Sequence, residues 1–237
     1  MKDETDLSAE REWLYQERAR IAVTNLQKKN FNAQYIITQA EALATVLAMI
    51  PGGTTVVRDD SVTVDQIGII PALKKRHQNK VIDPFEWDAD GVLVAEVQEE
   101  RPRMQREAFI ADVFLTGTNA ITLDGKLVNT DVMGNRVAPM IFGPKKVIIV
   151  AGVNKILKDV NEAMERISQV AAPINARRHY LKHHQSKLSD LPCVRTGRCM
   201  DCNHKWRICN STVIIENAFH PNKGRINVVL VAQALGI

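Results

Sequence analysis

The sequence of 237 residues lacks long apolar runs and has little excess charge of either sign. No window approaches the roughly 18 uninterrupted apolar residues that a membrane-spanning helix needs. The N-terminal stretch MKDETDLSAEREWLYQERAR is charged and contains no apolar core, so it does not resemble a secretory signal. Lys and Arg number 31 against 27 Asp and Glu, which is too small an excess to indicate nucleic-acid binding. We therefore expect a cytoplasmic protein that binds neither membranes nor nucleic acid.

Two common nucleotide-binding motifs are also missing. The chain contains neither a GxxxxGK[ST] phosphate-binding loop nor a GxGxxG dinucleotide fingerprint. Apolar residues make up 45% and charged residues 24%, close to average globular usage, which excludes a disordered or collagen-like chain. The length suffices for one large domain with a sizeable core, or for a domain with an appendage.

Helical and strand patterns alternate along most of the chain. Residues 10–30 and 155–172 each carry an apolar face at helical spacing. Residues 147–150 are apolar on both faces, as expected of a central buried strand. Asp124-Gly125 is a strong hairpin signal. The alternation predicts an α/β fold, a layered mixed sheet with helices on both faces.

We expect four consecutive units along the chain. Residues 1–30 form an N-terminal helix, and residues 31–190 form the α/β domain. A cysteine-containing metal-binding loop occupies residues 191–211. Residues 212–237 then supply closing strands of the α/β domain.

All four cysteines lie in one short segment, Cys193-x5-Cys199-x2-Cys202-x6-Cys209. In a reducing cytoplasm, clustered cysteines bind metal or do redox work more often than they form disulfides. One close pair flanked by two wider spacings suits a 4Fe–4S cluster at least as well as a zinc ion. Nearby Arg and Lys side chains would offset thiolate charge and lower the thiol pKa values. The alternative without a metal is a redox pair, Cys199 and Cys202, beside two incidental cysteines.

Residues 116–136 carry the densest set of small polar residues outside the cysteine segment. They begin where a predicted strand ends, and open α/β sheets bind ligands beyond strand ends, so we expect a ligand site there. Arg136 would pair an anion, and Asn and Thr side chains would fix hydroxyls or a carboxylate. Asp131 and Asp124 are the candidate acid–base residues, and Asp131 is also a candidate ligand position. For any single residue ordinary turn chemistry is an equally good interpretation, and Asp124 fits the hairpin turn better than catalysis.

Ser61 and Thr63, just before a predicted helix, form a second candidate anion site. Hydroxyls and free N–H groups at a helix start can hold an anion. An ordinary helix N-cap is the favoured interpretation of the same pattern.

Two segments resemble the LUD domain, the lactate-utilisation protein family. They are FLTGTNAITLDGKLVNTDVMGNRVAPMIFGPKKVIIVAGVNKI, which is specific, and SVTVDQIG, which supports it. The cysteine segment resembles that of short family members with a TG-x-C-x-D-C signature, here Thr196 to Cys202. The resemblance extends from about residue 10 to the end of the sequence.

The resemblance implies a fold similar to the sugar-isomerase, CoA-transferase and formyltetrahydrofolate cyclo-ligase group. It also implies a link to lactate oxidation, in which some family members work beside iron–sulfur and flavin subunits. Unlike longer members with two ferredoxin-type motifs, this chain has a single four-cysteine loop, which argues against a role as the main electron-transfer subunit. The family resemblance also implies ligand binding at nine positions, and it assigns no catalytic role to any of them. These positions are Ser61, Thr63, Asn119, Thr122, Gly125, Asn129, Gly134, Asn135 and Arg136.

Three functions remain open. The first is a component of organic-acid metabolism with a 4Fe–4S cluster or zinc in the cysteine loop. It would bind a small carboxylate or phosphorylated metabolite at residues 116–136, with other lactate-utilisation subunits as candidate partners. The second is an isomerase- or transferase-type enzyme with a structural zinc loop. The third is a non-catalytic sensor or accessory subunit, and self-association is open in all three.

Overall fold

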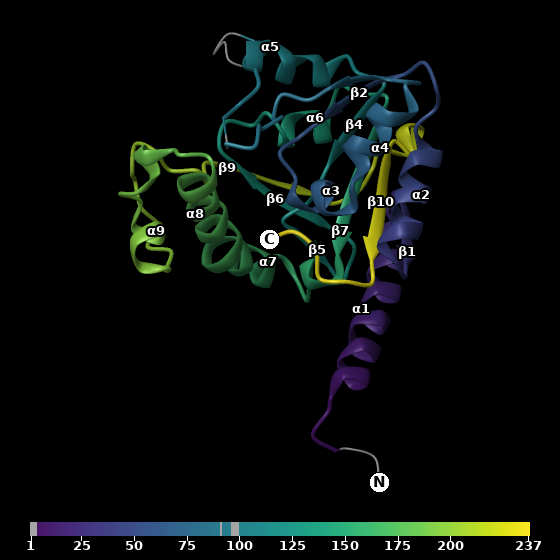
Figure 1. Ribbon diagram of the computed structural model, residues 1–237. Helices are drawn as coiled ribbons and strands as arrows, with labels where there is room; N and C mark the ends of the chain where they lie inside the picture. The colour runs from purple at the N-terminus through teal and green to yellow at the C-terminus, as the bar shows by residue number, and fades with distance from the viewer. Residues whose placement is uncertain (1–3, 91, 96–99) are drawn as a thin grey trace.

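The computed structural model describes residues 4–90, 92–95 and 100–237. It contains a six-stranded and a four-stranded β-sheet, with helices packed on both faces of the larger one (Figure 1). No helix in these residues is long and apolar enough to cross a membrane. The α/β prediction is confirmed, with one difference: the hairpin strands form a second sheet and leave the main sheet purely parallel.

The main sheet has the strand order β1-β10-β7-β4-β2-β3, and every neighbouring pair is parallel. All six carboxyl ends therefore lie along one edge. The strand bounds are β1 (Asn32–Ile36), β10 (Ile226–Val231), β7 (Lys146–Gly152), β4 (Val113–Thr116), β2 (Thr55–Arg58) and β3 (Lys80–Ile82).

Strand β7 is central, and its successive side chains enter two different cores. Val147 and Ile149 join the apolar cluster beneath α1, whereas Ile148 and Val150 join the cluster on the opposite face. All four are fully buried, which explains the apolar run on both faces and confirms the predicted central strand. The helices of the two layers are α1 (Ser8–Lys28) on one face, and α2 (Gln39–Met49), α3 (Val62–Ile67) and α4 (Ile69–Arg76) on the other.

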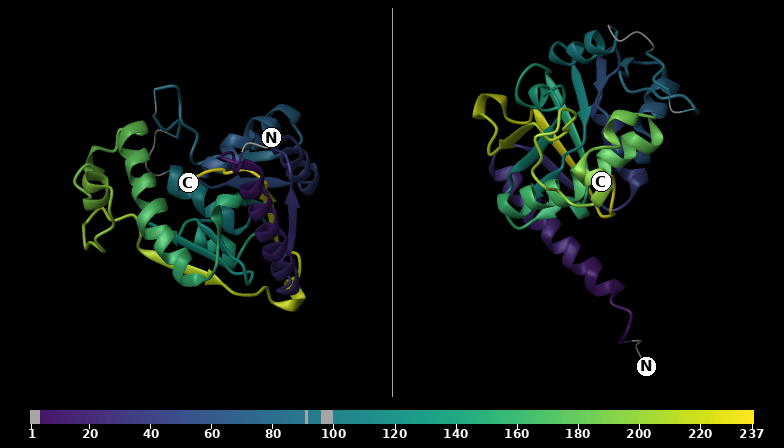
Figure 2. Two further views of the ribbon diagram at one scale, coloured as in Figure 1. Left: turned by 90° about the horizontal axis from the view of Figure 1, so that it is seen from below. Right: turned by 90° about the vertical axis from the view of Figure 1, so that its left-hand side faces the viewer.

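Helix α1 confirms the helix predicted over residues 10–30. Ala19, Ala22 and Leu26 are fully buried against the sheet. Its N-terminal half extends beyond the rest of the molecule (Figure 2). The Trp13 side chain on this half is exposed. The remaining short helices of the main body are α5 (Glu100–Arg106) and α6 (Val137–Ile141).

The smaller sheet corrects the helix predicted over residues 155–172. Ile156 and Leu157 pair with Ile121 and Thr122 as a strand, and α7 begins only after Asp159, whose side chain caps it. Tertiary pairing therefore overrides the helical periodicity of the first turn. The sheet order is β8-β5-β6-β9, with β8 (Ile156–Leu157), β5 (Ala120–Thr122), β6 (Leu127–Asp131) and β9 (Ser211–Ile215).

The cysteine loop projects from the body on a helical arm (Figures 1 and 2). The arm comprises α7 (Val160–Arg166), a π-helical turn and α8 (Ala172–Lys182), followed by α9 (Pro192–Thr196). A small apolar cluster of Ala176, Leu188, Leu191 and Val194 fixes the loop to α8. After the loop, β9 joins the smaller sheet and β10 joins the main sheet.

Candidate functional site

A cavity of about 570 Å³ lies at the carboxyl edge of the main sheet. Residues directly after β2, β4 and β7 line one side of it, and α8 and the cysteine loop line the other. Residues 232–237 run from β10 across this edge toward α8 (Figure 1). Open α/β sheets bind ligands in this position, so the cavity is the candidate site.

Basic side chains outnumber acidic ones around the cavity. Three of the lining residues are acidic, namely Asp59, Asp60 and Asp131. Seven are basic: Arg101, Arg136, Lys155, Arg178, Lys187, Lys205 and Arg207. The imbalance favours an anionic ligand.

Lys155 is the most buried of these cations, with 5% of its surface exposed. It lies in the turn after β7, and its Nζ donates a 3.1 Å hydrogen bond to Thr63 Oγ1. Gly236 packs against both, and a Cβ on Gly236 would lie 2.9 Å from Lys155 Nζ. Burial lowers the pKa of Lys155 to about 7, and the positive charges of Arg166 and Arg136 act in the same direction.

Asp59 and Arg136 form a buried pair behind the polar loop. Arg136 Nε lies 3.5 Å from Asp59 Oδ2, and the guanidinium donates to Asn129 Oδ1 at 2.6 Å and Asn119 Oδ1 at 2.9 Å. Burial raises the pKa of Asp59 to about 6, and Arg136 opposes that rise. Since most donors of Arg136 bind the protein itself, its main role here is to hold the loop together.

A second buried carboxylate, Asp60, is strongly held by two α8 side chains. Arg178 donates two hydrogen bonds to it, the shorter one at 2.5 Å, and His179 Nε2 lies 3.2 Å from Asp60 Oδ2. Burial acts to raise the pKa of Asp60, but the hydrogen bond from His179 and the charge of Arg178 outweigh it and hold the pKa below its usual value. The Arg178 charge is thus already compensated.

Trp87, His179 and His183 form an aromatic cluster next to Asp60, which His179 contacts. His183 stacks on Trp87 with ring centroids 3.7 Å apart, and His179 lies 5.0 Å from His183. Burial lowers the pKa of His183 to about 4, with the charge of His179 acting in the same direction. His183 is therefore neutral at physiological pH and serves as a packing residue.

Six of the predicted ligand positions line the cavity. Ser61 is also the N-cap of α3, since its Oγ accepts a hydrogen bond from Val64 N, which confirms the favoured interpretation of that hydroxyl. Asp131 uses both carboxylate oxygens to accept backbone N–H groups of Val132, Arg136 and Val137, so it fixes the loop. The six are Ser61, Thr63, Asn119, Asp131, Asn135 and Arg136.

The other predicted positions do not line the cavity, and three of them lie in the β5–β6 hairpin. Thr122 Oγ1 donates to Asp124 Oδ1, as expected of turn chemistry. Gly125 lies beneath α1, where a Cβ would be 2.6 Å from the carbonyl carbon of Asn25. Asn129 is fully buried behind the cavity, and Gly134 has a φ of 90° in the following turn.

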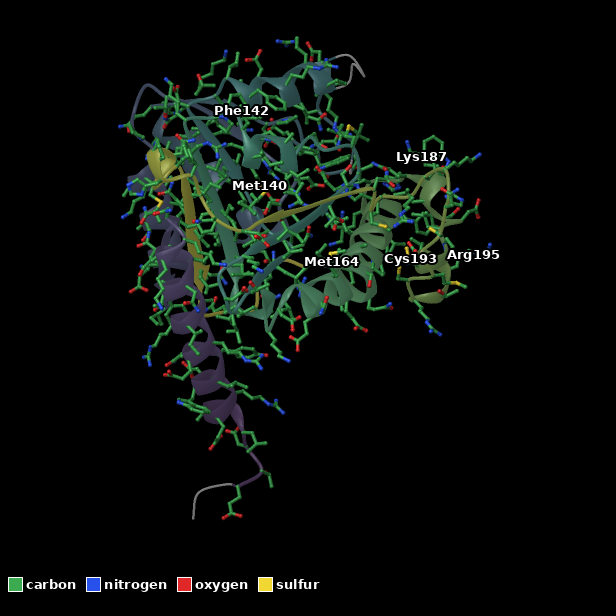
Figure 3. The ribbon with its side chains drawn as sticks, turned by 180° about the vertical axis from the view of Figure 1, so that it is seen from behind. Met140, Phe142, Met164, Lys187, Cys193 and Arg195 are labelled. Atoms are coloured by element: carbon green, nitrogen blue, oxygen red, sulfur yellow. The ribbon has the colours of Figure 1, made fainter. Side chains whose placement is uncertain are left out.

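The cysteine loop contributes one wall of the cavity through residues 205–210, which include Cys209. Its four cysteines are half-buried free thiols. Arg207 links two of them by donating to Cys202 O at 2.6 Å and Cys209 O at 3.0 Å. Figure 3 shows Cys193 and Arg195 on this projecting arm, far from Met140 and Phe142 on the main body.

The structure corrects one expectation about these thiols. Burial raises the pKa of Cys193, and the charges of Cys202 and Cys209 raise it further, although a lowered pKa was expected. Four thiols that act on one another within one loop suit a soft metal. Within the described ranges, however, no group of three or more His, Cys, Asp or Glu side chains is arranged to hold a metal ion. Metal binding by the loop therefore stays a prediction.

Sequence reasoning missed Lys155, Arg178 and His179. Lys155 falls within the helix predicted over residues 155–172, and the charge pattern of the basic stretch that contains Arg178 and His179 is typical of a solvated helix face. The available signal for Lys155 was its place just after the central strand, because the residues that follow parallel strands share one edge.

Comparison with known proteins agrees with this architecture. The LUD domain family model matches residues 19–231. The fold is similar to the crystal structure of a DUF162 family protein from Deinococcus radiodurans, with a TM-score of 0.51 and 14% identity over 92% of this chain and 97% of that one. A weaker likeness, to eIF2B delta from Chaetomium thermophilum, has a TM-score of 0.33 and 16% identity over 64% of this chain and 54% of that one. No curated protein matches the sequence.

The structural likeness to the DUF162 protein and the family-model match support different conclusions, the first about the fold and the second about the family. At 14% identity the likeness to the DUF162 protein shows the fold alone. The family match is independent of it and spans most of the chain. The protein therefore belongs to the LUD domain family, which is associated with lactate utilisation.

Proposed function

We propose that the cavity binds a small organic anion, a carboxylate or a phosphorylated metabolite, as part of organic-acid utilisation. The observation that carries this proposal is Lys155, whose ammonium group has no carboxylate of a described residue within ion-pair distance. Burying an unpaired charge costs free energy, and a bound anion would supply the missing partner. Binding would also raise the pKa of Lys155 and take up a proton near neutral pH.

A second cation of the cavity supports the same ligand class. Arg101 Nε is buried and has no hydrogen-bond partner within the described residues. Its guanidinium lies over the Phe85 ring, 4.8 Å from the centroid, so its position is fixed by packing. By contrast, Arg136 and Arg178 already have carboxylate partners. Among the cavity cations that are not exposed, Lys155 and Arg101 are thus the two without a carboxylate partner in the described residues, and they are the best suited to a ligand carboxylate or phosphate.

The cysteine loop is the second part of the proposal. It would hold a 4Fe–4S cluster or a zinc ion through Cys193, Cys199, Cys202 and Cys209. A cluster would supply one-electron chemistry, whereas zinc would fix the loop. Because Cys209 lines the cavity, the proposed metal and anion sites would be neighbours. Other lactate-utilisation subunits remain the proposed partners.

Thermal unfolding with added anions tests the cavity proposal. The panel is L-lactate, pyruvate, inorganic phosphate and ribose 5-phosphate, each measured with the full chain. A ligand at 100 times its Kd would stabilise the protein by about 2.7 kcal/mol. Lys155→Met should abolish this shift and also raise the melting temperature of the ligand-free protein, because it removes a buried unpaired charge.

Lys158→Met is the matched control. Lys158 is exposed and lies three residues further along the chain, so this variant should keep the full ligand shift. Retention of the shift in Lys155→Met would remove Lys155 from the site. Absence of a shift with every anion at millimolar concentration would refute the cavity proposal.

A further inference from the structure

The amine of Lys155 is placed to react as well as to bind. It donates its one hydrogen bond within the described residues to Thr63 Oγ1, so a neutral amine there keeps its lone pair free. Gly236 has no side chain that would crowd Nζ, which a Cβ would approach to 2.9 Å. Lys155 also lines the cavity, so a ligand can reach it.

The surroundings of Lys155 keep much of this amine neutral. Burial is the main cause of its lowered pKa of about 7, and the cations Arg166 and Arg136 add to it. About half of the Lys155 side chains are then uncharged at pH 7, against roughly one in a few thousand for an ordinary lysine. A desolvated lysine beside other cations is a recognised way to obtain a nucleophilic amine.

We propose that Lys155 forms an imine with small carbonyl compounds that carry a carboxylate, with 2-oxo acids as the substrate class. This inference rests on the proposed function, because the cavity must first hold the carboxylate. Arg101 supplies the second group, since it lines the same cavity as Lys155 and its Nε has no hydrogen-bond partner in the described residues, which suits it to the ligand carboxylate. A 2-hydroxy acid would bind in the same cavity without reacting.

The reaction needs no oxidant or reductant. The neutral amine adds to the carbonyl carbon, and a proton moves from nitrogen to the former carbonyl oxygen to give a carbinolamine. Loss of water, which carries away that oxygen and both amine hydrogens, then leaves the C=N bond. Protonation of the imine nitrogen from solvent regenerates a cation beside the ligand carboxylate, so the charge pairing of the proposed site is kept.

Reductive trapping tests the proposal directly. The full chain is incubated at pH 7 with pyruvate or with L-lactate as the matched hydroxy acid, and borohydride is then added. Hydride transfer to the imine carbon gives a stable secondary amine, which blocks tryptic cleavage after that lysine and is located by mass spectrometry. We expect a pyruvate adduct on Lys155 at least ~10-fold above that on any exposed lysine, given the difference in neutral amine fraction. We expect no adduct with lactate.

Lys155→Arg separates the reactive role from the electrostatic one. Arginine keeps the positive charge and forms no such imine, so this variant should retain a thermal shift with lactate and lose the adduct. Lys158→Met should retain both.

Two contrary outcomes are distinguishable. A thermal shift with pyruvate, but no adduct on Lys155 or equal labelling of exposed lysines, would overturn the imine and leave the proposed anion site intact. No shift with any anion and no adduct would overturn both.

Discussion

The cavity and the cysteine loop are built in opposite ways. The cavity combines residues distant in sequence, such as Asp59, Arg101, Lys155 and Arg178, and buries several of them. The cysteine loop takes its chemistry from one short segment whose thiols are only half-buried. The cavity side chains are fixed by hydrogen bonds and ion pairs, whereas the loop is fixed to α8 mainly by a small apolar cluster.

The comparison shows that the residues of a site can be easy to recognise in the sequence although the fold holds them loosely, and the reverse. The spacing of the cysteines in the sequence identifies the candidate metal ligands. The distances between those ligands depend on the conformation of a peripheral loop. A cavity at strand ends is positioned by the core of the sheet, but its members are scattered through the sequence. The two meet at Cys209, which lines the cavity, so perturbing one region can show how far it depends on the other.

The largest expected effect comes from Arg136→Ala in the cavity. The change removes hydrogen bonds to Asn119 and Asn129 and leaves Asp59 without its ion-pair partner. We expect the free energy of unfolding to fall by about 3–5 kcal/mol, measured by urea denaturation at pH 7. The control is Arg195→Ala in the exposed part of the cysteine loop, with a change within about 0.5 kcal/mol. Equal losses in the two variants would contradict the contrast between the regions.

The second prediction concerns the pH dependence of the cavity. The folded-state pKa of Asp59 is raised to about 6, so the folded protein holds a proton that the unfolded chain has released between about pH 4 and 6. The contribution of Asp59 to stability therefore falls as the pH rises through this window, by at most about 1.4 kcal/mol per pH unit.

Asp59→Asn isolates this contribution. The stability of the variant relative to the wild type should increase from pH 4 to pH 6 and then level off, whatever the net effect of the substitution. Urea denaturation at half-unit pH steps measures it. A difference that stays constant with pH would show that Asp59 titrates normally.

The smallest expected effect on global stability is in the cysteine loop. The double variant Cys199→Ser and Cys202→Ser should lose all bound metal, yet change the free energy of unfolding by only about 1 kcal/mol, because the loop can open without unfolding the sheet. Hydrogen exchange in residues 191–210 should accelerate, while exchange in β7 stays slow.

The metal itself is identified by anaerobic purification followed by iron, sulfide and zinc assays. A colourless protein with stoichiometric zinc would contradict the 4Fe–4S form, and absence of all three elements would contradict both forms. Loss of the anion-dependent thermal shift in the double variant would show that the two regions act as one site.

Much of the fold was predictable because its signals are local. The apolar spacing in α1, the two-sided apolar run of β7 and the Asp124-Gly125 turn each specify their element within a few residues. The helix predicted from residue 155 was wrong at its start, because Ile156 and Leu157 gain more by pairing with β5 than by adding a turn to α7. That pairing depends on β5, which is distant in the sequence, so the spacing of apolar residues around residue 156 does not reveal it.

The sequence by itself determined the α/β class, the central strand at residues 147–150 and the concentration of every thiol in one loop. Only the tertiary structure decided that Lys155 is a buried cation in the cavity, that Arg136 is bound mainly to the protein itself, and that the cysteine loop forms a cavity wall. Periodicity and spacing record interactions between near neighbours in the chain. Burial and charge pairing depend on which strand ends meet at one edge, and parallel packing brings together residues that the sequence keeps far apart.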